Sequence, residues 1–442
     1  MYATRSRKQR RQSLEDDDID ELLLWDLLFE SSDDSDTISN CRAKRRVIDR
    51  GITEGHARIF QDYFSDNPVY PESMFRRRYR LPSKLLKSLI RDIEAHDSYF
   101  KQRRDAVGRL GASAYQKITA ALRVLCYGVS FDSTDEYCRE SETVCRESFH
   151  RFCRAVVELH AHKYLRNPTI DDLKRIEKEN AKRGFPGMIG SLDCSHFRWK
   201  NCPRGWSGQF TGKEGKPTVV LEAIASGDLW IWHAVFGLPG SLNDINILQK
   251  STFVDKLIAG IIPDIPYSLN GNLYTQPYFL TDGIYPRWTI FQQTISEPAD
   301  NKKKLFAKMQ EAVRKDVERA FGVLKARFHI LANPCRLWFL QDFEYVVKCA
   351  IILHNMSIQF DQNMVDYDEE MTVMRQDTMQ VHDGQVPEES LIDASSEVLP
   401  PLPVLSIASQ IAQKMKSFDN EYAHSKLRSD QIEELWAKHG RN

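Results

Sequence analysis

The stretch "GMIGSLDCSHFRW", residues 187–199, marks the point where the sequence changes from helical to strand-like spacing. Three β-rich runs follow, broken by Gly, Pro and Asp turns: "PTVVLEAIAS" (217–226), "LWIWHAVFG" (229–237) and "PYFLTD" (277–282). A helical pattern over 243–260 separates the last two runs, and one long helix is predicted over 302–328. Strands and helices in this order predict an α/β layer architecture.

The region before this stretch, residues 56–180, is helical in pattern. Apolar residues recur at three- and four-residue spacing, and several segments start on Ser. Short helices with brief turns suggest a helix-turn-helix-like DNA-binding bundle, with 141–160 as the candidate recognition helix. Arg151 and Arg154 lie on or near one side of that helix, together with Arg146 and His150. The alternative is that these residues form an ordinary solvated helix face.

The outer parts of the chain differ from the predicted core in composition. Residues 1–55 alternate basic and acidic blocks with little apolar mass, which predicts a disordered charged tail. Residues 181–360 are assigned to the catalytic domain, and 361–403 to an acidic linker. An amphipathic helical segment over 404–442 is expected either to pack back on the chain or to pair with a partner.

Charge and cysteine content limit the classes of protein that remain. The 61 basic and 62 acidic residues nearly cancel, so a nucleic-acid partner has to be argued from local patches. Nine cysteines without a C-x-x-C pair argue against a disulfide framework. No apolar run is long enough for a membrane span, and no secretory signal is visible. We expect an intracellular protein, and the basic runs near the start are compatible with entry into the nucleus.

Three carboxylates stand where a metal site could form. Alternation places Ile189, Ser191 and Asp193 on one strand face, and Asp282 ends the last β-rich run just before a glycine. Glu318 lies at the border of the apolar face of the long helix, whose members are Leu305, Met309, Val313, Val317, Phe321, Leu324 and Phe328. Such a triad can hold two Mg²⁺ or Mn²⁺ ions about 4 Å apart for phosphodiester cleavage or transfer. With 62 acidic residues in the chain, the spacing alone is a weak signal.

Four sequence blocks, in order, resemble the signature blocks of the PIF/Harbinger transposases, a DDE superfamily with a ribonuclease-H-like core. They are "GMIGSLDCSHFRWKNCP", "GLPGSLNDINIL", "LTDGIYP" and "VERAFGVLKARFHIL", and the resemblance covers about residues 75–360. Thirty-five residues separate Asp282 from Glu318, as in that family. The resemblance implies that Asp193, Asp282 and Glu318 are the catalytic, metal-binding triad, with two Mg²⁺ or Mn²⁺ ions as cofactors.

Other residues near the triad have more than one interpretation. Asp244 matches an acid of the family blocks and is either a further metal ligand or part of a helix cap with Asn243. Cys194, His196 and Cys202 suggest zinc only weakly, because no fourth ligand is evident.

The loop after the first strand, "KNCPRGWSGQFTGKEGK", is a candidate DNA contact. It combines cations with aromatic rings and glycines, at Lys200, Arg204, Trp206, Phe210, Lys213 and Lys216. The alternative is a basic exposed hairpin. Lys325, seven residues after Glu318, either contacts a substrate phosphate or is solvated.

The main hypothesis is a transposase, or a nuclease derived from one, that cuts DNA strands and transfers the freed 3′-hydroxyl to a target phosphodiester. The resemblance implies a Myb-like partner protein, an oligomer and a nuclear location. The second hypothesis is a domesticated relative that binds DNA or chromatin without catalysis.

Overall fold

A five-stranded mixed sheet forms where the strand-like spacing begins. The computed structural model describes residues 48–380, 416 and 418–440. The sheet order is β3-β2-β1-β6-β7, built from β1 (Met188–Arg198), β2 (Thr218–Ala225), β3 (Ile231–Pro239), β6 (Tyr278–Thr281) and β7 (Phe291–Gln293). β1, β2 and β3 pair antiparallel, whereas β6 runs parallel to β1 and to β7. The α/β prediction is confirmed, and this order is compatible with a ribonuclease-H-like core.

Strand β1 contains an irregularity that corrects one sequence-based placement. Its register with β6 shifts between Met188 and Gly190. Ile189 therefore packs with Ile224 in one core cluster, whereas Met188 joins a different cluster. Ser191 donates a hydrogen bond to the Val313 carbonyl, on the side of the sheet covered by helix α13. The prediction that Ile189 shares a face with Ser191 was wrong, because a bulge interrupts strict alternation.

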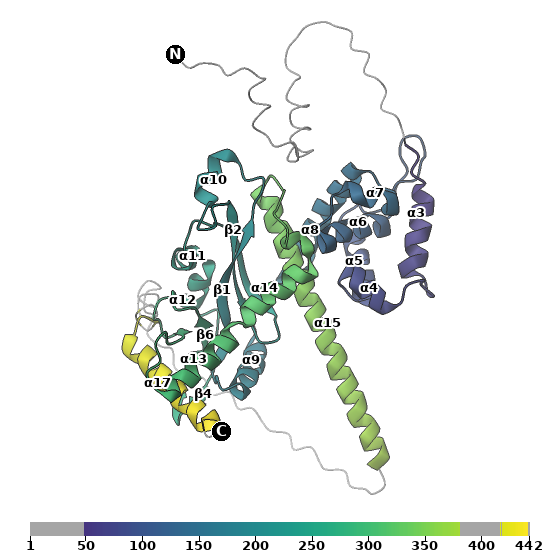
Figure 1. Cartoon of the computed structure of the whole chain (residues 1–442). Helices are drawn as coiled ribbons and strands as arrows, with labels where there is room; N and C mark the ends of the chain where they lie inside the picture. The colour runs from purple at the N-terminus through teal and green to yellow at the C-terminus, as the bar shows by residue number, and fades with distance from the viewer. Residues whose placement is uncertain (1–47, 381–415, 417, 441–442) are drawn as a thin grey trace, which may run out of the picture. The chain divides into compact units, whose positions relative to one another are not determined.

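Helices cover both faces of the sheet. In Figure 1, α11 (Asp244–Lys250) and α12 (Thr252–Ile258) lie to the left of the labelled strands, and α14 (Asp316–Arg327) lies to the right. The single helix predicted over 302–328 is two helices, α13 (Asn301–Arg314) and α14, separated at Lys315. The buried Asp316, held by the Arg183 guanidinium, fixes the start of α14 at this break.

The helical character of the region before the sheet is confirmed. Its helices are α3 (Ile52–Ile59), η1 (Phe60–Phe64), α4 (Glu72–Tyr79), α5 (Ser83–His96), α6 (Ala114–Tyr127), η2 (Asp132–Thr134), α7 (Asp135–Cys138), α8 (Glu142–Tyr164) and α9 (Ile170–Lys182). The predicted recognition helix is the first part of α8, which packs against α5, α6 and α15 (Leu340–Gln380). A helix-turn-helix arrangement for DNA stays a prediction.

Two helices, one near each end of the described chain, extend across the expected domain boundaries. Helix α15 runs through position 361, where the acidic linker was expected to begin, and α3 starts before position 56. Helix α17 (Glu421–His439) packs on α13 and on β4 (Tyr267–Leu269), which forms a hairpin with β5 (Asn272–Tyr274). Most of the predicted tail and of the linker lies outside the described residues, so the domain division stays a prediction.

Two chain-wide features complete the description. The eight cysteines in the described part of the chain are all free thiols. Among the described helices, none combines the length and the apolar character needed to span a bilayer.

Candidate active site

Asp193 and Asp282 lie side by side on neighbouring parallel strands. Ser191 of β1 is paired with Leu280 of β6, and each aspartate stands two positions further along its own strand. Alternation from Ser191 therefore places the Asp193 side chain on the face that carries α13 and α14. β6 ends at Thr281, and the carboxylate of Asp282 accepts the Gly283 N–H at 2.5 Å. The sheet thus presents two carboxylates at the same level where β6 ends.

Asp193 lies in an environment that disfavours its ionised form. Burial raises the pKa of Asp193 to about 6. The Cys194 N–H and the Arg314 guanidinium oppose this rise, while the carboxylates of Glu318 and Asp244 add to it. Since the last two act through their charge, both lie close enough to Asp193 to repel it.

Glu318 is an exposed residue in the first turn of α14, where a carboxylate also suits the helix dipole. Its Oε1 atom lies 3.0 Å from Nη1 of Arg314, the last residue of α13. The Arg314 side chain is 16% exposed. The break between the helices therefore positions a mostly buried cation beside the third predicted metal ligand.

Asp244 approaches the same group of acids from α11. The cap of α11 is Asn243, whose side chain accepts the Asn246 N–H at 2.9 Å, so the capping interpretation applies to Asn243. Burial raises the pKa of Asp244. A hydrogen bond with the Cys194 thiol opposes this rise, whereas the charge of Asp282 contributes to it. A role for Asp244 as a metal ligand stays a prediction.

The carboxylates of these acids are chemically suited to a hard divalent cation, but they are spread apart in this structure. Aspartate and glutamate oxygens are the ligands that Mg²⁺ and Mn²⁺ prefer, and their mutual repulsion is the kind that a cation relieves. Yet among the described residues no three His, Cys, Asp or Glu side chains are grouped closely enough to hold a metal ion. Glu318 is engaged by Arg314 instead of turning to the aspartates. Closing the site would require this ion pair to open.

The basic loop after β1 reaches from the strand end back to the acids. It contains a short helix, α10 (Arg204–Phe210). The sequence had left a basic exposed hairpin as the alternative to a DNA contact. Its cations Lys200, Arg204, Lys213 and Lys216 are exposed. Lys213 lies within charge range of Asp244, whose pKa it lowers. Trp206 is 48% exposed and stacks on Phe210.

Lys325 is neither fully solvated nor remote from the acids. Its Nζ atom donates to Ser195 Oγ at 2.9 Å and lies 4.5 Å from the centre of the Phe197 ring. Both partners lie on β1, on the same face as Asp193. Burial lowers the pKa of Lys325, and the charge of Glu214 opposes this. The ammonium group is therefore held on the same strand face as the first catalytic candidate.

The predicted DNA-contacting arginines of α8 are engaged within the chain. Arg151 forms ion pairs with Glu147 at 2.5 Å and with Asp97 at 3.2 Å. Arg154 lies over the ring of Tyr345, at 5.4 Å from its centre. These contacts reduce the positive potential that this face offers to a phosphate, so DNA binding by α8 gains no support from its geometry.

Two groups near the acids were not foreseen from the sequence. The Tyr285 hydroxyl lies 3.6 Å from the Cys194 sulfur, and burial raises the pKa of this tyrosine. Arg314 was not singled out, although its position four residues before Glu318 on a helical pattern is a signal for an ion pair. The zinc candidates have other contacts: Cys194 lies beside Tyr285, and His196 contacts Thr218.

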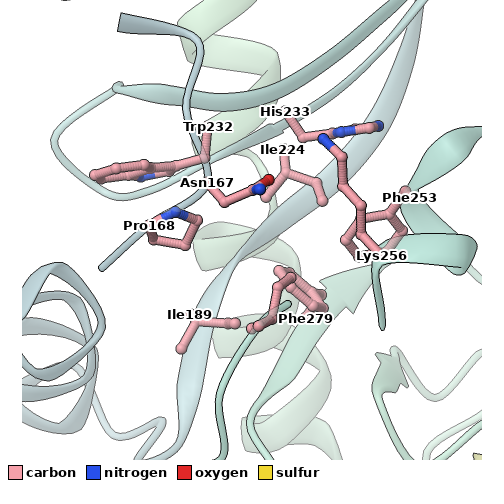
Figure 2. Close-up of a pocket in the computed structure, with 10 residues that line it drawn as sticks. Asn167, Pro168, Ile189, Ile224, Trp232, His233, Phe253, Lys256 and Phe279 are labelled. Carbon is pink, nitrogen blue, oxygen red and sulfur yellow. The ribbon is translucent and has the colours of Figure 1, made fainter. Parts of the chain in front are cut away.

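An apolar pocket near the sheet is separate from these acids (Figure 2). Trp232 and Pro168 line one side of it, and Phe253 and Lys256 line the other. His233 also lines it, but its Nε2 atom lies 3.3 Å from both Glu222 and Ser251. None of the four candidate acids lines this pocket, so it adds nothing to the candidate active site.

Comparison with known proteins connects the chain with transposon-derived families. Residues 162–365 match the family described as "Plant transposon protein", and residues 55–94 match a domain of unknown function. "Protein ALP1-like" of Arabidopsis thaliana is 23% identical over 260 residues, which are 58% of this chain and 63% of that protein. "Putative nuclease HARBI1" of Bos taurus and of Homo sapiens is 20% identical over 178 residues, 40% of this chain and 47% of each relative.

These matches confirm the resemblance inferred from the four sequence blocks. The matched segments cover less than two thirds of each relative's length. No solved structure matches the chain.

Proposed function

From the PIF/Harbinger-type transposase domain that residues 162–365 carry, we propose that the chain is a DNA endonuclease and strand transferase of the DDE class on a ribonuclease-H-like core. The observation that carries this proposal is the register of β1 and β6. It brings Asp193 and Asp282 together from positions 89 residues apart, and Glu318 acts on Asp193 through its charge. Carboxylates that repel one another lower the stability of the fold unless a cation joins them, which favours a metal-binding role over a purely structural one.

The proposed roles follow from this geometry. Asp193, Asp282 and Glu318, with Asp244 as an additional ligand, would hold two Mg²⁺ or Mn²⁺ ions, which supply an activated water and stabilise the leaving oxygen. Lys325 and Lys213 lie beside the acids and would neutralise the phosphates that flank the cut. Water attacks the phosphorus and breaks its bond to the 3′ oxygen, which leaves a 5′-phosphate on one end and a protonated 3′-hydroxyl on the other. This 3′-hydroxyl then attacks a target phosphodiester, joins to its phosphorus and displaces the 3′-hydroxyl of the target strand. No bond between protein and DNA is needed.

The further elements of the proposal concern partners and location. The exposed loop with Lys200, Arg204, Trp206 and Lys216 would follow the DNA backbone next to the site. Arg151 and Arg154 would contribute only after exchanging their present partners for phosphates. Action as an oligomer, in the nucleus and with a Myb-like partner is proposed from the family relation alone.

A second candidate function is a DNA- or chromatin-binding adaptor without catalysis. The observation that favours it is the Arg314–Glu318 ion pair, which engages the third acid in a contact with a cationic side chain. The two candidates differ in one measurable property, because an adaptor needs neither divalent ions nor the aspartates in order to bind DNA.

The deciding experiment is cleavage of an end-labelled DNA duplex by the purified full chain with Mg²⁺ or Mn²⁺. Asp282→Asn should abolish cleavage while leaving DNA affinity and thermal stability nearly unchanged, because it removes a ligand charge without changing volume. Asp193→Asn and Glu318→Gln should behave alike. Asp255→Asn, an exposed aspartate of α12, is the matched control and should cut normally.

Either of two results would remove the proposal. If Asp282→Asn cut at the wild-type rate, the triad would be misassigned. If the wild-type chain bound DNA but did not cut the duplex, even with the element's own ends and the partner protein added, the adaptor function would replace the nuclease.

A further inference from the structure

The loop at 332–339, between α14 and α15, is built onto the end of β1. The Lys200 N–H donates to the Cys335 carbonyl, and the Cys335 N–H donates to the Arg198 carbonyl, each at 2.8 Å. The indole N–H of Trp199 donates to the Leu337 carbonyl at 2.8 Å. These bonds join segments about 135 positions apart, so the loop is a fixed extension of the sheet.

This loop exposes two large aromatic rings, and its anchor Trp199 also contacts a third exposed ring. Trp338 is 46% exposed and Phe339 is 65% exposed. Trp206 of α10 has its ring 6.2 Å from that of Trp199, the residue that also anchors Leu337. We call Trp206, Trp338 and Phe339 the aromatic rim. Large rings held at the surface on rigid backbone cost solvation free energy, and such patches usually mark a binding surface.

The two segments that carry the aromatic rim also carry cations. Lys200, Arg204 and Arg336 belong to the same two segments and are exposed. Neither 199–212 nor 332–339 contains an acidic residue. An anionic partner with flat apolar faces would complement this combination, which is the pattern of single-strand nucleic-acid surfaces: cations follow the backbone while rings stack on bases.

We propose that the aromatic rim binds unpaired DNA bases, so that the chain holds a melted or single-stranded segment several base steps from the bond it cuts. This inference rests on the proposed nuclease function and names the form of DNA that the site takes. It also assigns a role to Arg336, Trp338 and Phe339, which lie outside the predicted DNA-binding loop.

The distance from the candidate acids fits such a role. Trp199 lies six residues beyond Asp193 and directly follows the last residue of β1. At about 3.3 Å per strand residue the rim lies about 20 Å from the acids, or roughly six base steps. One DNA molecule can therefore be paired at the cut and unpaired at the aromatic rim.

The test is binding of a fluorescent oligothymidylate of about 12 nucleotides, measured by anisotropy beside a blunt duplex. The wild-type chain should bind the oligothymidylate, and Trp338→Ala/Phe339→Ala should bind it at least roughly fivefold more weakly for each lost ring. Duplex binding should change much less. Tyr422→Ala removes an exposed ring of α17 and is the matched control. Arg336→Gln should reduce the salt dependence by about one phosphate contact.

The outcomes separate this inference from the nuclease proposal. Wild-type affinity of the double variant for oligothymidylate would overturn the inference even if Asp282-dependent cleavage were intact. Oligothymidylate binding that depends on Trp338 and Phe339, without any cleavage, would support the proposed role of the aromatic rim and contradict the nuclease function. If no oligonucleotide bound and the double variant lost self-association in sedimentation, the rim would be a protein contact and the inference would be wrong.

Discussion

At the scale of single residues, Arg314 decides whether Glu318 can join the other acids. A guanidinium at 3.0 Å competes with any divalent cation for the same carboxylate. Arg314→Gln should therefore lower the melting temperature of the metal-free chain and increase the rise in melting temperature that Mn²⁺ produces. Calorimetry with and without Mn²⁺ measures both.

The control for Arg314→Gln is Arg319→Gln, which removes an exposed arginine of α14 that pairs with Asp316. It should leave the Mn²⁺-induced shift unchanged. An unchanged or smaller shift in Arg314→Gln would show that Arg314 does not compete with the metal.

The buried carboxyl group of Glu140 leads to a prediction about how the free energy of unfolding depends on pH. Both of its carboxylate oxygens are buried without a hydrogen-bond partner. Burial raises its pKa to about 8 from an ordinary value of 4.5, and Lys117 opposes the rise. The folded state thus binds the proton more tightly than the unfolded chain, so the stabilising contribution is full below pH 4.5 and is lost as the pH rises through about 8.

We expect the free energy of unfolding to fall between these pH values by up to about 1.4 kcal/mol per pH unit from this group. Glu140→Gln should flatten that part of the profile in urea titrations. Glu136→Gln, an exposed neighbour on α7, should keep the wild-type slope. A wild-type profile that is flat over this range would contradict the assignment.

Candidate site residues could be chosen where their order along the chain resembles a family pattern, and their roles stay a prediction. The blocks around Asp193, Asp282 and Glu318 keep the spacing of a family, and β1 and β6 place the two aspartates together. Ion pairing could not be predicted in the same way. Arg151 meets Asp97, 54 positions away, and such a partner depends on how α8 packs on its neighbours.

At the scale of elements, α17 shows that an amphipathic sequence pattern does not specify what a helix packs against. The amphipathic pattern allowed α17 to pack back or to bind a partner, and the structure has it against α13 and the β4–β5 hairpin. The hairpin itself was not predicted, because strands of three residues give too short a pattern. The break at Lys315 was missed for a similar reason, since one residue hardly alters a helical repeat.

Asp430 is the polar anchor of this docking. Its carboxylate accepts from Asn270 Nδ2 at 3.0 Å, Asn272 Nδ2 at 2.8 Å and the Tyr274 hydroxyl at 2.5 Å. Asp430→Ala leaves three donors without their acceptor, which should lower the free energy of unfolding by about 3 kcal/mol. Urea unfolding gives the loss, and limited proteolysis should show earlier cutting in α17.

Glu433→Ala serves as the comparison for Asp430. Glu433 pairs with Lys302 at 2.6 Å on a half-exposed surface, and removing such a pair should cost less than about 1 kcal/mol. Equal losses in the two variants would mean that Asp430 does not anchor the helix.

At the scale of the whole molecule, the helical region and the sheet share one hydrophobic core. The larger cluster of buried residues extends from Ile59 in α3 through the sheet to Met356 in α15. The sequence predicted two separate domains because the composition changes near 181. It could not predict this continuity, since α8 and α15 meet across about 200 positions.

Asn355 provides the test of that continuity, because it joins the two regions by hydrogen bonds. Its Nδ2 atom donates to the Tyr164 carbonyl at the end of α8 and to the Ile231 carbonyl of β3, both at 2.8 Å. Its Oδ1 atom accepts the Ile231 N–H at 3.1 Å, and the side chain is fully buried. Asn355→Ala should lower the free energy of unfolding by roughly 3 kcal/mol, because backbone groups of both regions lose their partner.

Hydrogen exchange followed by mass spectrometry reads both regions in one experiment. If the core is one cooperative unit, Asn355→Ala should reduce protection in α6 and in β2 by similar free energies. Gln362→Ala, which removes a half-buried bond to Asp228 from the same helix, should change both only slightly. Loss of protection confined to α6 would instead mean that the helical region unfolds independently of the sheet.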